Sequence, residues 1–128
     1  MLVRTKLAPV GSTGNTTHAS ASLPEANNLA ALCVEFEITA VGGTPTVTYK
    51  VQGSLDDGSV RDADSDWFDL MVIPANSDTG VATDTKTAVG VYAYFLATPR
   101  LAIRKIRLVT SANTNVTYEA DVMARVWA

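Results

Sequence analysis

The chain has 128 residues, of which 47% are hydrophobic and 18% are charged, and its formal net charge is −3. This length suits a single domain with one hydrophobic core, and the apolar content excludes an intrinsically disordered chain. No uncharged apolar run is long enough for a membrane-spanning helix, and the acidic balance argues against a nucleic-acid partner.

Cys33 is the only cysteine, so no disulfide can form within the chain. Small secreted domains usually depend on several disulfides, and residues 1–10 lack the apolar run of a signal peptide. We therefore expect the protein to be made in a cytoplasm.

The first 22 residues predict a strand followed by an extended segment. Residues 3–10 have weak strand character, and residues 11–22 are small and poor in apolar side chains. Such a segment is typical of an arm. We predict an N-terminal strand or arm over residues 1–22 and a folded domain over residues 23–128.

Two segments then alternate between apolar and polar residues. Every second side chain is apolar in residues 32–40 and again in residues 46–52, which is typical of strands with one buried face. A short glycine-containing turn separates them, so we predict an antiparallel hairpin. In it, Lys50 would pair with Glu35 or Glu37 across the strands.

Four further strands follow, separated by polar loops. They are predicted at residues 67–73 (buried on both faces), 88–97, 101–109 (with a β-bulge near Arg104 and Lys105) and 116–126,. The expected fold is therefore all-β. It is an antiparallel β-sandwich, jelly-roll-like or immunoglobulin-like, with about seven to eight strands and an extended N-terminal arm.

Residue types that could support catalysis are scarce. His18 is the only histidine and lies in the segment of small residues, whereas a catalytic base needs a rigid, oriented site. Cys33 has no histidine or second cysteine near it in sequence, so zinc binding is not expected. We expect neither enzymatic activity nor a cofactor.

One acidic loop offers hard oxygen ligands. Asp62, Asp64 and Asp66 alternate as at the start of an EF-hand, but Trp67 and Ile73 occupy the positions that need glycine and glutamate,. An EF-hand is therefore excluded. A simpler calcium site in this loop remains an alternative to a solvated acidic loop.

Several side chains are candidates for contact with other subunits, because more apolar residues are present than the inward faces of the strands require. The basic residues of the 101–109 strand and the penultimate tryptophan add polar and aromatic contacts. The candidates are Leu2, Val3, Arg4, Leu7, Arg104, Lys105, Arg107 and Trp127. The outer faces of the strands at residues 67–73 and 88–97 are also unusually apolar.

Three segments carry a resemblance to a known group of proteins. They are Val51-Gln52-Gly53-Ser54, Trp67-Phe68-Asp69-Leu70, and the stretch from Pro99-Arg100 to Leu108 that leads through a polar turn to the last strand. Their order resembles small β-sandwich virion proteins of tailed bacteriophages, particularly head decoration (cement) proteins. The resemblance begins at Phe36 and covers about two-thirds of the chain.

The resemblance implies a capsid decoration protein that binds the major capsid protein and stabilises the phage head. It implies a homo-oligomer, trimeric or dimeric, made in the host bacterium and located on the capsid surface, and it carries no catalytic residues. Two alternatives stay open. One is a tail, neck or head-fibre base component, and the other is a calcium-assisted carbohydrate-binding sandwich.

Overall fold

The computed structural model describes residues 2–23, 29–55, 67–96 and 103–126, and the regular elements in these ranges are all β-strands. This confirms the predicted all-β class. The strands are β1 (Leu2–Ser12), β2 (Ala21–Ser22), β3 (Leu29–Ser54), β4 (Trp67–Asp69), β5 (Val72–Pro74), β6 (Asp84–Lys86), β7 (Gly90–Leu96) and β8 (Lys105–Val126).

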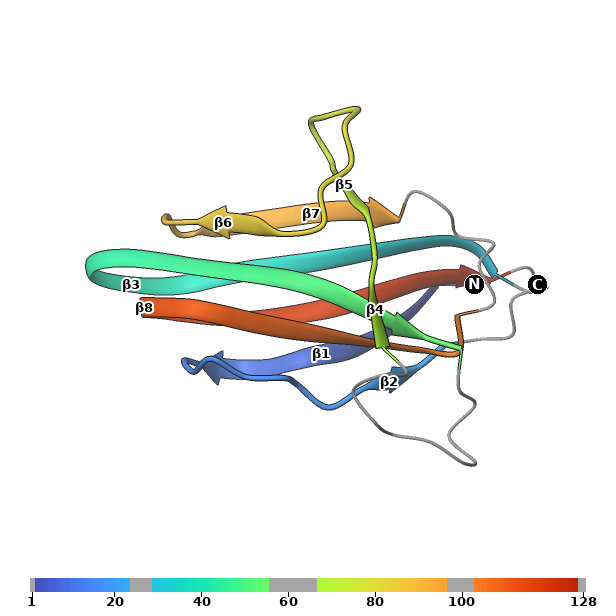
Figure 1. The fold of residues 1–128 in the computed structure, drawn as a ribbon, viewed down its shortest axis with the longest axis horizontal. Coiled ribbons are helices and arrows are strands. Elements are labelled where there is room, and N and C mark those ends of the chain that lie inside the picture. Colours follow the sequence, from blue (N-terminus) through green and yellow to red (C-terminus); the bar gives the residue numbers. More distant parts are fainter. Residues whose placement is uncertain (1, 24–28, 56–66, 97–102, 127–128) are drawn as a thin grey trace.

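The centre of the fold is a long antiparallel ribbon formed by β3 and β8. Their pairing runs from Leu29 opposite Val126 to Ser54 opposite Lys105, with register shifts near the middle, between Val41 and Thr48. At this point both strands turn back on themselves (Figure 1). We call this the bend end, and we call the opposite end, where the two ends of the ribbon meet, the open end.

The folded ribbon produces the predicted antiparallel sandwich. In the first layer the order is β1, the second half of β8, the first half of β3, β7 and β5. In the second layer β2 pairs with the first half of β8, while β4 and β6 pair with successive parts of the second half of β3. The two layers are therefore continuous through β3 and β8.

Left-handed backbone conformations mark the bend in both strands. Gly43 of β3 has φ 41°, and Ala112 and Asn115 of β8 have φ 49° and 56°. Glycine and asparagine tolerate this region better than other residues, so the sequence favours a change of direction here. The predicted turn at residues 111–115 is thus a bend within β8.

The predicted hairpin between residues 32–40 and 46–52 is wrong. In the structure each half of β3 lies between β8 and a third strand, β7 for the first half and β6 for the second. The halves face each other across the core and are not neighbours in one sheet. Turn residues in the sequence indicate that the chain reverses direction. They are compatible both with a hairpin in one sheet and with two strand halves that face each other in different layers.

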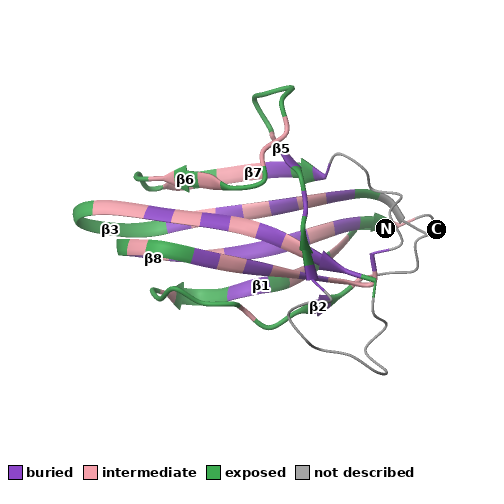
Figure 2. Ribbon diagram, in the orientation of Figure 1, coloured by how far each residue is buried: buried purple, intermediate pink, exposed green. Residues whose placement is uncertain are grey.

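The core forms between the inward faces of the two layers, where buried and less buried residues alternate along β3 and β8 (Figure 2). Phe36 of the first layer stacks on Tyr49 of the second, and Tyr118 of β8 stacks beside Phe36. The predicted inward faces of residues 32–38 and 47–51 are confirmed, whereas Ala40 is exposed.

One of two other strand predictions needs correction. Residues 67–73 are not one strand buried on both faces. They form β4 and β5, separated by Leu70 and Met71, where the chain crosses from the second layer to the first. The predicted bulge near Arg104 and Lys105 is supported, because Lys105 pairs with Ser54 and the Arg104 amide also donates to the Ser54 carbonyl at 2.8 Å. Ile103 and Ile106 on either side of it are both buried, as the predicted change of phase requires.

Residues 2–23 pack against β8 in both layers. Leu2–Ser12 pairs with the second half of β8, and Thr17, Ala21 and Ser22 pair with its first half. Leu7 and Ala8 are buried in the core. In this structure the segment that we expected as an arm forms one side of the sandwich.

Candidate interaction surfaces

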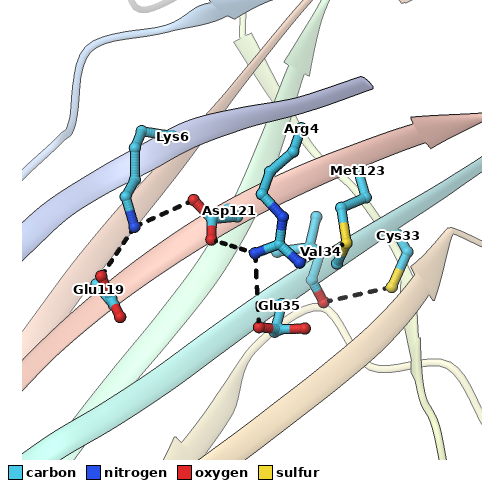
Figure 3. A network of polar contacts seen from close by, with 8 residues as sticks. All are labelled: Arg4, Lys6, Cys33, Val34, Glu35, Glu119, Asp121 and Met123. Atoms are coloured by element: carbon cyan, nitrogen blue, oxygen red, sulfur yellow. Dashed lines mark hydrogen bonds and ion pairs between the residues drawn. The ribbon is translucent and has the colours of Figure 1, made fainter. Parts of the chain in front are cut away.

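The outer face of the first layer carries a ladder of charged side chains that we call the charge ladder (Figure 3). It consists of Arg4 and Lys6 on β1, Glu119 and Asp121 on β8, and Glu35 and Glu37 on β3. Figure 3 draws all of these except Glu37. The register places Glu35 opposite Asp121 and Glu37 opposite Glu119. The four carboxylates therefore form a compact block, with the two bases at its β1 side.

Ion pairs connect the bases to this block. The Arg4 guanidinium lies 2.8 Å from Asp121 and 3.9 Å from Glu35, and the Lys6 ammonium lies 2.8 Å from Glu119 and 3.2 Å from Asp121. Arg4 and Lys6 are exposed, whereas Asp121 is buried. Ion pairs with solvent-exposed bases contribute on the order of 1 kcal/mol each. Their main effect is to fix the register of β1, since a slip would move Arg4 and Lys6 away from their partners.

Glu37 differs from Glu119, its neighbour in the charge ladder, in the direction of its pKa shift. The hydrogen bond from Lys6 lowers the pKa of Glu119 and raises that of Lys6, whereas a hydrogen bond with Glu119 raises the pKa of Glu37. Like charges that lie opposite each other across strands destabilise a sheet. Glu37 is thus the member of the ladder that opposes folding when it is ionised.

The other half of the same outer face is apolar. Phe95 of β7 lies opposite Cys33 of β3 on one side and Ile73 of β5 on the other, and Cys33 lies opposite Met123. Phe95 is 50% exposed, and Val89, Val91 and Met71 are more exposed still. The prediction that the strand at residues 88–97 has an apolar outer face is confirmed by these exposures.

Arg107 anchors a different cluster, on the outer face of the second layer. Its guanidinium carbon lies 4.2 Å from the ring centroid of Trp67, and its Nε donates a hydrogen bond of 2.9 Å to Gln52. Gln52 donates to Asp69, which also pairs with Lys50 at 3.1 Å. The predicted pairing of Lys50 with Glu35 or Glu37 is therefore wrong, because those acids lie on the outer face of the other layer.

His18 lies in a hydrogen-bonded network rather than free on the surface. Its Nε2 is 2.8 Å from the Tyr118 hydroxyl, which is also 2.8 Å from the Thr110 hydroxyl and donates to the Gly14 carbonyl. Burial lowers the pKa of His18. The network attaches residues 14–18 to β8, and the sequence could not reveal it because its members are about 100 residues apart.

The open end brings together most of the side chains that we predicted as interface candidates. β1 begins there beside the end of β8, since Leu2 pairs with Arg125, and β8 begins there at Lys105. Leu2 is 57% exposed, Arg4 is exposed, and Val3, Arg104, Lys105 and Arg107 are partly buried. The start of β1, the end of β8 and the start of β8 lie on the same side in Figure 1.

One interface candidate is corrected by the structure. Leu7 is only 2% exposed and packs in the core, because the inward face of β1 is turned toward the second layer at this position. Trp127 lies outside the described residues, as do the calcium candidates Asp62, Asp64 and Asp66. Within the described ranges, no group of three acidic, histidine or cysteine side chains is arranged to hold a metal ion, and no helix could cross a membrane.

Comparison with known proteins extends these observations. No family model and no curated protein matches the sequence. The fold, a sandwich of folded antiparallel strands, is shared with a solved structure at a TM-score of 0.61, which covers 99% of this chain and 96% of the other at 9% identity. That structure is described as the SPBc2 prophage-derived protein YomS.

Proposed function

We propose that this protein is a structural virion protein of a tailed bacteriophage that decorates the capsid by binding the major capsid protein. The observation that supports this best is the fold shared with a prophage-derived protein over almost the whole of both chains. The order of strands and turns that resembles head decoration proteins points in the same direction. In this proposal the protein acts by adding contact area between capsid subunits and has no enzymatic activity.

The surface we propose for capsid binding is the open end. It combines an exposed apolar side chain, Leu2, with the basic residues Arg4, Arg104, Lys105 and Arg125. An apolar centre with charged residues around it is typical of protein interfaces. The rigid folded ribbon would hold this end in a fixed shape, so that many copies could bridge capsid subunits in the same way.

Immunogold electron microscopy of particles made by the genome that encodes this chain tests the proposal. Labelling over the whole head is expected. Labelling confined to the tail, neck or head fibres would overturn capsid decoration and favour the alternative virion component. Unlabelled particles would contradict a virion protein altogether.

Binding to purified empty capsids tests the proposed surface. In a co-sedimentation assay we expect Leu2→Asp to reduce the bound fraction and Val10→Asp to leave it unchanged. Val10 is a suitable control because it lies on the same strand near the bend end and is 72% exposed. Equal binding by both variants would show that the open end is not the contact.

The calcium-assisted carbohydrate-binding alternative has its own test. If the aspartate loop at residues 56–69 held calcium, the cation would raise the melting temperature of the purified protein, and glycans would raise it further. We expect no such shift.

A further inference from the structure

The outer face of the first layer combines the charge ladder with an apolar patch that lies beside it. The register places Phe95 opposite both Cys33 and Ile73, and it places Cys33 opposite Met123. The apolar patch consists of these residues and the two other outward residues of β7, so its members are Cys33, Ile73, Val91, Ala93, Phe95 and Met123. The Arg4 guanidinium of the ladder lies 3.2 Å from the Met123 sulfur (Figure 3). The patch and the ladder therefore form one continuous surface.

The centre of the apolar patch is open to solvent in the isolated chain. Val91 and Phe95 are 57% and 50% exposed, and the other four members are partly buried. Single exposed apolar residues are ordinary on protein surfaces, whereas a contiguous group marks a contact with another molecule. Both exposed residues belong to β7, which pairs with β3, so the sheet holds them in fixed positions.

The charges beside the patch indicate what kind of molecule it contacts. Glu37 lies opposite Val91, and Glu35 lies opposite Ala93. The two bases of the ladder are on β1, which is separated from β3 by β8. The patch is thus bordered by carboxylates and not by the bases of the ladder. A partner that covers β7 places its own side chains next to these two acids.

Glu37 is the least balanced of the carboxylates. Its hydrogen bond with Glu119 raises the pKa of Glu37, and within the described residues no basic side chain forms an ion pair with it. Proteins keep local conflicts of this kind mainly at functional sites. A cationic group supplied from outside, next to Val91, would favour the ionised form of Glu37 and relieve its repulsion from Glu119.

We propose that the apolar patch binds a segment of another protein in which apolar side chains flank a lysine or an arginine. The apolar side chains cover Phe95 and Val91, and the cationic group lies over Glu37, so that both the shape of the contact and its charge are complementary. A second copy of this chain fits less well. If two patches stack on each other, the bases of both copies remain on β1, away from Glu37. The inference goes beyond capsid decoration at the open end, and it concerns the isolated chain.

An NMR titration of the isotope-labelled protein with three synthetic peptides tests the chemistry of the partner. Each peptide has leucine and phenylalanine on both sides of a central residue, which is lysine, glutamine or glutamate. We expect the lysine peptide to shift the amide signals of β7 and of residues 33–37, and to bind about fivefold more tightly than the glutamine peptide. The glutamate peptide should bind more weakly still. Equal affinities, signal shifts confined to other regions, or no binding of the lysine peptide at millimolar concentration would overturn the proposal.

Two pairs of variants test the residues on which the proposal depends. Glu37→Gln should weaken binding of the lysine peptide about fivefold, whereas Asp69→Asn removes the same charge from the outer face of the second layer and should leave binding unchanged. Phe95→Thr keeps a residue that suits a strand and should weaken binding by at least about tenfold. Val10→Thr is its control, since Val10 is 72% exposed on β1.

The Glu37→Gln variant also separates binding from folding. Because the substitution removes a repulsion within the ladder, we expect this variant to melt at a higher temperature than the wild type and yet to bind the lysine peptide less tightly. Unfolding cannot explain such a combination. If Glu37→Gln binds as tightly as the wild type, or if either control loses as much affinity as the variant it is paired with, the proposal fails.

Discussion

The rings of Phe36 and Tyr49 stack face to face across the two layers, with centroids 3.8 Å apart and planes inclined by 13°. Both residues belong to β3, one in each half of the folded strand. Their contact is possible only because β3 turns back on itself. This part of the core can therefore form only when β3 is bent.

Replacing Phe36 should therefore have a large effect on stability. Phe36 has no exposed surface, and truncation of a buried phenylalanine to alanine costs about 3–5 kcal/mol. We expect Phe36→Ala to lower the free energy of unfolding by this amount in urea titrations, and Phe36→Leu by less. A loss below about 1 kcal/mol for the alanine variant would contradict the central place of this stack.

A buried hydroxyl network offers a second test. The Tyr94 hydroxyl donates a 2.6 Å hydrogen bond to Asp84 and contacts the Tyr49 hydroxyl, and burial raises the pKa of both tyrosines. Tyr94→Phe removes the hydrogen bonds that this hydroxyl makes with Asp84 and Tyr49 at a buried position, so we expect a loss of about 1–3 kcal/mol. Tyr92→Phe is the control, because it removes a hydroxyl that bonds the Ala88 carbonyl at a less buried position. Equal losses for the two variants would argue against the network.

From the backbone conformation at the bend, we predict two substitutions that change the stability in opposite directions. Gly43 has φ 41°, where an alanine side chain costs about 1–2 kcal/mol,. Gly43→Ala should therefore destabilise the protein. Ala112 already occupies the left-handed region with φ 49°, so Ala112→Gly should relieve strain and stabilise by up to about 1 kcal/mol. Thermal unfolding followed by circular dichroism measures both, and effects of the same sign would show that the bend is not strained as described.

His18 predicts a loss of stability in mild acid. Burial lowers the pKa of this side chain, so the folded protein binds the proton less tightly than the unfolded chain does,. Stability should hold above the unfolded value of about 6.5 and fall as the pH drops below it toward the lower folded pKa. His18→Gln should flatten the profile between pH 7 and 5.5, roughly the range in which histidine titrates. An unchanged slope in this variant would assign the acid effect to other groups.

The charge ladder predicts a stabilising substitution. Glu37 has a raised pKa because of its hydrogen bond with Glu119, so its ionised form is unfavourable in the folded state. Glu37→Gln should raise the melting temperature at neutral pH. The gain should shrink at high salt and also at acid pH, where the wild-type carboxyl takes up a proton. Glu35→Gln is the comparison, because it removes the ion pair of Glu35 with Arg4 and should not stabilise.

The sequence alone predicted a large part of the fold. Alternation fixed the inward faces of residues 32–38, 47–51 and 116–124, since a strand with one buried face must place apolar residues at every second position. The apolar outer face of β7 was also visible in the sequence. The same information identified Leu2 and Arg4 as available for contacts, but it wrongly included Leu7.

The charge ladder and the hydroxyl networks could not be predicted in the same way. Glu37 and Glu119 are far apart in sequence, and they meet because β3 and β8 pair in one particular register. Likewise, Lys50 reaches Asp69 rather than Glu35 because the bend places the two halves of β3 in different layers. Alternation describes which face a residue occupies, but it contains no information about the partner strand.

The sequence by itself thus determined an all-β chain, the inward face of each main strand and the place where the chain reverses, because these depend on local backbone preference and on burial at every second residue. Only the tertiary structure decided that the reversal folds a two-stranded ribbon into two layers and that most of the predicted contact residues meet at the open end. These features depend on strand order and register, which are set by the packing of distant segments.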